Sequence, residues 1–163
     1  MTLNLLLAAA VLLDVPFVEQ DKDTCAAAAL SMVMSYWQQP VPQEEVARAL
    51  LEKDLHGILG SRLAQFAKDR GFQAIAFAGD LGLLRDYLAK GRPLIVTWKV
   101  GRKRYHDVVV VGIGATGGIL VNDPAVGKAR EVSERDFEKR WAGADHWTLL
   151  VLPLAPPGAS RPE

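Results

Sequence analysis

The chain has 163 residues, of which 50% are hydrophobic and 23% are charged, the size and composition of one globular domain. Its 19 basic and 19 acidic residues cancel, which argues against nucleic acid as a partner because phosphate binding needs a concentrated basic surface. A single cysteine excludes an internal disulfide, and the three histidines lack metal-ligand spacing, so we expect no metal and no cofactor.

Residues 1–13 form an apolar segment that resembles the hydrophobic core of a secretory signal, with small residues at 8–10. The segment is too short to span a bilayer as a mature helix, so we expect no stable membrane span. No Lys or Arg precedes it, and a mis-assigned start codon or an ordinary N-terminal segment would give the same pattern. We slightly favour export, to the periplasm or the extracellular space, over a cytoplasmic location.

The first predicted helix follows a short extended segment held by Pro16 and runs from Cys25 to about Trp37. Between residues 26 and 34 its only polar residue is Ser31. A helix that is apolar nearly all round is usually buried in the middle of a domain. We therefore expect this helix to lie in the core.

The rest of the chain is predicted to be helical first and then rich in β-strands. The first part has helices at 43–53, at 61–70 after a cap at Ser61, and from residue 80 to about 90, with a strand at 73–77. The second part has strands at 94–100, 105–113, 119–122 and 147–152, and a helix from a cap at Ser133 to about 141. This order predicts an α+β fold with a mostly antiparallel sheet, in a domain at 14–153 followed by a flexible tail at 154–163.

Cys25 falls in the first turn of its helix, after Asp23 and Thr24, which are residue types that cap helix N-termini with their side-chain oxygens. The helix dipole and the unpaired N–H groups there favour an anion, which for a thiol is the thiolate. Gln20 is near enough in sequence for its side-chain amide to reach the anion site at Cys25. A thiolate, a helix N-terminus and a nearby amide donor are the parts of an acyl-transfer site. The plainer interpretation is that Cys25 is a small buried hydrophobe.

One strand is predicted to be covered on both faces, because residues 108–111 are four consecutive valines. His106 begins this strand, and Asp123 ends the next one. Adjacent antiparallel strands bring such positions side by side, where a carboxylate can hold the imidazole tautomer and leave the other nitrogen for a thiol. Taken singly, His106 is more often a solvated strand end and Asp123 a turn residue.

Four motifs in this order resemble cysteine peptidase family 39, which is papain-like and includes bacteriocin-processing domains that cut after double-glycine leaders. They are Val-Pro-Phe-Val-Glu-Gln at 15–20, Cys25 opening a helix that ends in Tyr-Trp at 36–37, His106 before Val-Val-Val-Val-Gly at 108–112, and Val-Asn-Asp-Pro-Ala at 121–125. The resemblance covers residues from about 14 to 152 and implies a papain-like fold. No transporter or nucleotide-binding segment follows, so the chain resembles the free-standing members.

By this resemblance Cys25 is the nucleophile, His106 is its base and Asp123 orients the histidine. Gln20 and the backbone N–H of Cys25 would donate to the oxyanion. The family usually has Asp-Cys-Gly where this chain has Thr-Cys-Ala at 24–26. The alanine should preserve the helix, but it could hinder the close approach of a substrate backbone.

The sequence offers two further candidates for the residue that orients His106: Asn122, next to Asp123, and Asp107, next to His106. Asn122 is chemically admissible, because papain-like enzymes can use an amide at this place. Asp107 should face away from the working side of the imidazole, because neighbouring residues on a strand point to opposite faces. We choose Asp123, on which the family resemblance falls and whose carboxylate also stabilises an imidazolium.

The expected reaction is attack of the Cys25 thiolate on a carbonyl of a peptide or protein substrate, followed by hydrolysis of the acyl-enzyme. Two alternatives are a non-catalytic peptide-binding module of the same fold and a thiol acyl-transferase acting on a small molecule. Retention of the four site residues favours the enzyme, because a binding module has no need of them. The oligomeric state stays open.

The remaining charged residues of note are a basic hairpin tip at 99–104 and two further histidines, His56 and His146. The tip is predicted to be a solvated loop; the alternative is a rim that attracts acidic substrates or an anionic membrane surface. Neither histidine has a partner in sequence that suggests chemistry, and both are interpreted as structural.

Overall fold

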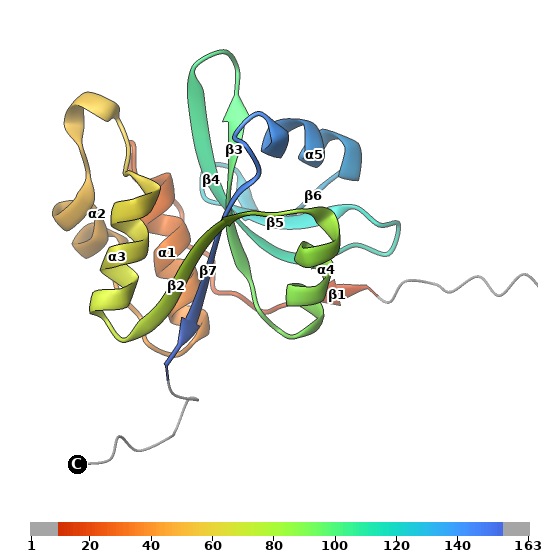
Figure 1. The fold of residues 1–163 in the computed structure, drawn as a ribbon, viewed down its shortest axis with the longest axis horizontal. Coiled ribbons are helices and arrows are strands. Elements are labelled where there is room, and N and C mark those ends of the chain that lie inside the picture. The colour runs from red at the N-terminus through yellow and green to blue at the C-terminus, as the bar shows by residue number, and fades with distance from the viewer. Residues whose placement is uncertain (1–9, 155–163) are drawn as a thin grey trace, which may run out of the picture.

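The computed structural model describes residues 10–154, which form a seven-stranded sheet covered by helices on both faces (Figure 1). The strands are β1 (Val11–Leu12), β2 (Phe72–Ala78), β3 (Leu94–Val100), β4 (Arg104–Ile113), β5 (Ile119–Asp123), β6 (Gly127–Val132) and β7 (Trp147–Pro153). The helices are α1 (Cys25–Tyr36), α2 (Gln43–Leu50), α3 (Gly60–Asp69), α4 (Leu81–Ala89) and α5 (Glu134–Ala142), with a 3₁₀ turn at Lys53–Leu55. The predicted α+β class is confirmed.

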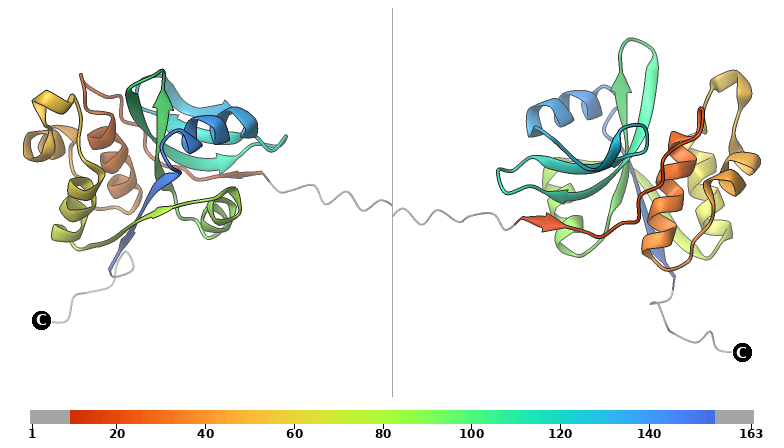
Figure 2. Two further views of the ribbon diagram at one scale, coloured as in Figure 1. Left: turned by 45° about the horizontal axis from the view of Figure 1, so that its top comes forward. Right: turned by 180° about the vertical axis from the view of Figure 1, so that it is seen from behind.

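The sheet has the strand order β2-β7-β3-β4-β5-β6, and every strand pair in the described part of the chain is antiparallel. Helices α1, α2 and α3 lie on one side of the sheet and α4 and α5 on the other (Figure 2). The central strand β4 therefore has a helical layer on each side. No helix within residues 10–154 is long and apolar enough to cross a bilayer.

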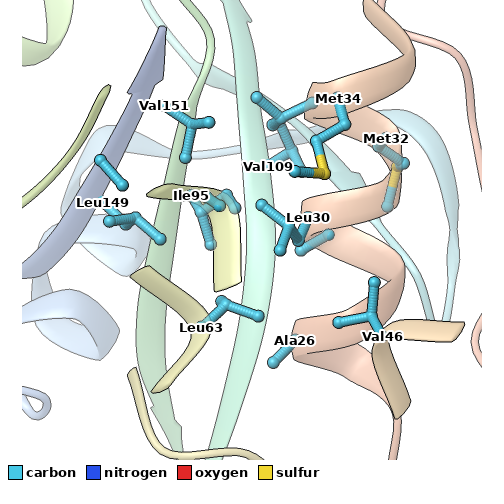
Figure 3. Packing of buried hydrophobic residues seen from close by; sticks show 14 of the residues in the cluster. Ala26, Leu30, Met32, Met34, Val46, Leu63, Ile95, Val109, Leu149 and Val151 are labelled. Atoms are coloured by element: carbon cyan, nitrogen blue, oxygen red, sulfur yellow. The ribbon is translucent and has the colours of Figure 1, made fainter. Parts of the chain in front are cut away.

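The four valines of β4 divide between these two layers. Val109 and Val111 pack with α1, as Figure 3 shows for Val109 beside Leu30, whereas Val108 and Val110 face the cluster that contains residues of α4 and α5. Each valine is at most 1% exposed, so the prediction of a strand covered on both faces is confirmed. Residues 26–34 of α1 are likewise all buried, as expected of a helix in the core.

Two strands were not predicted, and the first of them occupies the end of the apolar segment at 1–13. β1 pairs with β4 at Ile113 and Gly112, on a stretch of β4 that β3 does not reach. A Cβ atom at Gly112 would lie 1.9 Å from the carbonyl oxygen of Val11, so only glycine allows β1 this close. Residues 1–9 and most of the predicted tail lie outside the described residues. The second missed strand, β6, has charged residues at half of its positions and forms the sheet edge.

Two predicted helix ends also differ. The helix expected to be capped by Ser61 begins at Gly60, with Leu59 at the cap position and no side-chain cap. The helix expected at 43–53 ends at Leu50, after which the chain makes the 3₁₀ turn. Ser133 does cap α5, because its hydroxyl accepts a hydrogen bond from the Asp136 N–H at 3.1 Å.

Candidate active site

The predicted site residues come from three elements and one loop that meet at one end of the sheet. Cys25 is the first residue of α1, which packs on β4, while His106 lies near the start of β4 and Asp123 ends β5. Gln20, Cys25 and His106 line one cavity of about 440 Å³. Asp123 borders a second cavity of about 370 Å³, which His106 and Gln20 also line. Residues up to 103 positions apart in the sequence are thus brought together around His106.

His106 and Asp123 form a close pair, with 2.7 Å between His106 Nε2 and Asp123 Oδ1. The same carboxylate oxygen accepts a hydrogen bond from the Ala125 N–H at 2.9 Å, which fixes its position at the turn after β5. The His106 and Asp123 side chains are 15% and 10% exposed, so water screens their interaction only weakly. Nε2 is occupied, which leaves Nδ1 of the ring for the Cys25 side.

The environment favours the charged form of His106. Burial alone would lower the pKa of His106, but the carboxylate of Asp123 and the nearby sulfur of Cys25 outweigh it and raise this pKa from 6.5 to about 9. Burial also opposes ionisation of Asp123, yet its hydrogen bond with His106 leaves the pKa of the Asp123 carboxyl below its usual value. An imidazolium–carboxylate pair is therefore the expected state at neutral pH.

The Asn122 side chain bonds to the backbone, unlike that of its neighbour Asp123, which pairs with His106. It is 1% exposed; its Nδ2 donates to the Val15 carbonyl at 3.1 Å and its Oδ1 accepts from the Ala129 N–H at 2.9 Å. Both ends of the amide are therefore used to join β5 to the N-terminal segment and to β6. Of the two neighbours, it is Asp123 that contacts the imidazole.

Asp107 lies in the site beside Cys25, on the opposite face of β4 from His106. Asp107 and His106 do point to opposite faces of β4, as shown by their pairing with Thr97 and Trp98 of β3. However, α1 covers the face of Asp107, so the Asp107 carboxylate reaches the nucleophile: the Cys25 thiol donates to Asp107 Oδ2 across 3.7 Å. The prediction that Asp107 faces away from the working side of the imidazole agrees with this pairing, but strand alternation does not show that α1 packs on the face of Asp107.

The cap of α1 also differs from the expectation. Thr24 occupies the cap position but makes no side-chain cap. Its hydroxyl instead donates to the Asp21 carbonyl at 3.0 Å and to Gln43 Oε1 at 3.1 Å. Asp23 has a left-handed backbone, with φ of 61°, and its carboxylate is 3.2 Å from His56 Nδ1. The first N–H groups of α1, which have no partner within a helix, are thus not covered by either predicted cap.

Gln43 supports the loop before α1, a structural role that the sequence analysis missed. Its Nε2 donates to the Glu19 carbonyl at 2.7 Å, and its Oε1 accepts from the Asp21 N–H at 3.3 Å as well as from Thr24. It therefore holds the loop that carries Gln20 and leads into Cys25. In the sequence Gln43 is only the first polar residue of an amphipathic helix, which gives no signal of this role.

The Gln20 side chain has a buried polar atom that is left unpaired in the described part of the chain. Its Oε1 atom is buried and has no hydrogen-bond partner within residues 10–154. The Gln20 backbone is anchored, because its N–H donates to the Pro124 carbonyl at 3.0 Å. This bond ties the loop before α1 to the turn after Asp123.

The remaining predicted features lie at the rim or away from the site. Lys103 and Arg104 of the basic hairpin tip line the 440 Å³ cavity, together with His56. His146 is on the other helical layer, where its Nε2 is 2.6 Å from Glu138 Oε1. Within the described residues, no group of three or more His, Cys, Asp or Glu side chains is arranged to hold a metal ion.

Comparison with known proteins gives the same picture of the fold. A double glycine motif protease from an AMS/PCAT transporter, solved with its leader peptide, is 24% identical, with a TM-score of 0.71, and the match covers 88% of this chain and 97% of that one. The peptidase domain of Streptococcus ComA, a bi-functional ABC transporter of a quorum-sensing pathway, is 22% identical, with a TM-score of 0.71 and coverage of 84% and 96%. A structure described as a C39-like peptidase from Bacillus anthracis is 18% identical, with a TM-score of 0.71 and coverage of 88% and 98%.

These likenesses show a papain-like peptidase fold. No curated protein sequence matches the chain. The Peptidase_C39 like family matches residues 12–147, which is most of the chain and includes Cys25, His106 and Asp123. The protein therefore belongs to the peptidase C39-like family.

Proposed function

We propose that the protein is a cysteine peptidase that cleaves a peptide bond with Cys25 as nucleophile, His106 as acid–base group and Asp123 as the residue that orients His106. One observation carries the proposal. Cys25, the first residue of α1, lines the same cavity as His106, whose imidazole is paired at 2.7 Å with the carboxylate of Asp123. Nucleophile, base and orienting group in this order are what thiol acyl transfer requires.

In the proposed reaction the Cys25 thiolate attacks the carbonyl carbon of the scissile bond while His106 holds its proton. The imidazolium then gives that proton to the leaving amine, and the acyl group stays on the sulfur. Neutral His106 next takes a proton from water, whose oxygen attacks the acyl-enzyme and releases the acid. Asp123 remains ionised throughout, consistent with the lowered pKa of its carboxyl.

The developing oxyanion would lie between the Gln20 amide and the backbone N–H of Cys25. A helix N-terminus favours negative charge, and the Cys25 N–H belongs to the first turn of α1. The Gln20 loop is held on two sides, by Gln43 and by the hydrogen bond from the Gln20 N–H to Pro124. Such preorganised donors are worth on the order of 10²–10³ in turnover.

The proposed substrate is a peptide, for which the site has room on both sides of His106. The 440 Å³ cavity contains Cys25, and the 370 Å³ cavity extends past His106 toward Trp98 and Arg140. A chain lying across both would place its scissile carbonyl at Cys25. The double glycine motif protease of similar fold was solved with a leader peptide, which supports the same class of substrate here.

The test is incubation of the purified protein with a library of peptides from a digested proteome, with mass spectrometry of the new N-termini. We expect cleavage by the wild type that is lost in Cys25→Ala and in His106→Ala. Labelling by a thiol-reactive epoxide, measured as intact mass, should be lost in Cys25→Ala and slowed in His106→Ala. Peptide capture by wild type and Cys25→Ala alike, without any new N-terminus, would overturn the peptidase in favour of a binding module.

A further inference from the structure

Asp107 contacts the reactive sulfur directly, and its two carboxyl oxygens have different partners. Oδ2 lies 3.7 Å from Cys25 Sγ, and Oδ1 accepts a hydrogen bond from the Thr97 hydroxyl at 2.5 Å. The contact joins residues 82 positions apart and bridges β4 and α1. Asp107 has no part in the mechanism proposed above, so its position needs its own explanation.

An ionised carboxylate at this place conflicts with a thiolate. Two negative charges 3.7 Å apart repel each other strongly in a partly buried site. The ionised Asp107 would instead accept the S–H of Cys25 and hold it as the thiol. A protonated Asp107 reverses the bond, because its O–H would donate to the sulfur and stabilise the thiolate.

The surroundings of Asp107 give the ionised form little support. No Lys or Arg within residues 10–154 makes a salt bridge to it. On its other side a cavity of about 190 Å³ is lined, besides Asp107, by uncharged residues only: Ala26, Ile58, Gly60, Ser61, Leu63, Thr97 and Trp147. Burial raises the pKa of Asp107, which outweighs the opposite effects of Thr97, His106 and Cys25. Asp107 therefore holds a proton at a higher pH than an ordinary carboxyl.

The titratable groups facing Asp107 are few. Cys25 faces it from α1, and His106 adjoins it on β4, while Thr97 of β3 is neutral. The larger cavity adds a rim of charged side chains from the loops and the hairpin: Asp23, His56, Lys103 and Arg104. Asp23 and His56 pair with each other, and within residues 10–154 the side-chain hydrogen bonds of Asp107 are those to Cys25 and Thr97.

We propose that Asp107 is a further catalytic residue, a carboxyl group that gates the nucleophile: protonated, it donates to the Cys25 thiolate, and ionised, it holds Cys25 as the thiol. The proposal rests on the proposed function only in taking Cys25 as the nucleophile. In the reactive state Asp107 is neutral, Cys25 is a thiolate and His106 is an imidazolium. When Asp107 ionises, it releases one proton to water and the His106 proton returns to the sulfur. The unreactive state therefore has a carboxylate, a thiol and a neutral imidazole.

The test measures alkylation of Cys25 by iodoacetamide across pH, by intact mass, in wild type and Asp107→Asn. The asparagine keeps the shape and a donor but carries no charge. The two proteins should alkylate equally at about pH 5, and the variant should become about tenfold faster or more above neutral pH, because the charge 3.7 Å from the sulfur is gone. Superimposable profiles, or a variant slower at every pH, would overturn the proposal.

Two further variants separate this gate from a general effect on folding. Thr97→Val removes the hydrogen bond that favours the ionised carboxylate. When Asp107→Asn is introduced into Thr97→Val, the pH at which the two profiles diverge should be higher than in the wild-type background. If the profiles diverge at the same pH in both backgrounds, a group other than Asp107 controls the alkylation rate. Asp69→Asn, an exposed carboxylate that contacts Gln65 on α3, is the matched control and should reproduce the wild-type profile.

The readout is alkylation, so it does not depend on peptide cleavage. If no peptide is cleaved but the two profiles diverge as expected, the peptidase is wrong and the gate stands. If peptides are cleaved and the profiles coincide, the gate is wrong and the peptidase stands. The two proposals therefore fail independently.

Discussion

Replacing Asp123 with asparagine should change the charge state of His106 more than any other single substitution in the site. The variant keeps the size of the side chain but loses the negative charge 2.7 Å from His106 Nε2. Burial of His106, which by itself lowers its pKa, remains in the variant. We therefore expect the pKa of His106 to fall from about 9 by about two units or more.

The magnitude follows from the same shift. A rise of the His106 pKa from 6.5 to about 9 corresponds to about 3 kcal/mol of stabilisation of the folded protein. Because the folded-state pKa is the higher one, this stabilisation is complete below pH 6.5 and is lost as the pH rises through about 9. The His106 side chain is 15% exposed, so solvent screening removes little of it.

Two measurements check this prediction. Titration of the His106 ring followed by proton NMR, with the signal assigned through His106→Gln, gives the pKa in wild type and variant. Urea unfolding should show a difference between them of about 3 kcal/mol near pH 6 that shrinks as the pH passes about 9. Alkylation of Cys25 near neutral pH should slow in the variant, because the thiolate loses its imidazolium partner.

A matched control is Glu138→Gln, which removes the charge of another close histidine–carboxylate pair, that with His146. It should leave the His106 titration and the Cys25 alkylation unchanged. If the His106 pKa stays near 9 in Asp123→Asn, the reasoning is refuted, because the carboxylate would then not be what holds the imidazolium.

Three further predictions concern the surroundings of the site. Gln20→Ala should lower peptide turnover on the order of 10²–10³ in steady-state kinetics with Cys25 alkylation largely intact; unchanged turnover would place its amide outside the oxyanion pocket. Gln43→Leu removes three hydrogen bonds from the loop before α1. It should lower turnover, and it should lower the free energy of unfolding by about 1–3 kcal/mol. Wild-type turnover in a destabilised variant would show that the loop does not need Gln43 for catalysis. Asn122→Ala should also cost about 1–3 kcal/mol in urea unfolding, while the pH profile of Cys25 alkylation stays that of the wild type; a shifted profile would give Asn122 a role at His106.

Much of the site could be predicted because its residues carry local signals. The apolar helix at 26–34, the valine run at 108–111 and the order of the four motifs are all visible in the sequence. They predicted a buried helix beginning at Cys25, a doubly covered strand beginning near His106, and the C39 family, and all three are confirmed. The catalytic roles of Cys25, His106, Asp123 and Gln20 remain predictions, although these residues line adjoining cavities.

The sequence by itself thus determined all the α-helices, all the strands except β1 and β6, the family and the candidate residues, because periodicity and motif order are properties of the chain. Only the tertiary structure decided what surrounds the Cys25 sulfur. Strand alternation correctly separated Asp107 from His106 but could not say that α1 packs on the face of Asp107. Nor could it say that Thr24 would bond to Gln43 instead of capping α1. Both outcomes depend on contacts between segments far apart in the chain, which no local pattern records.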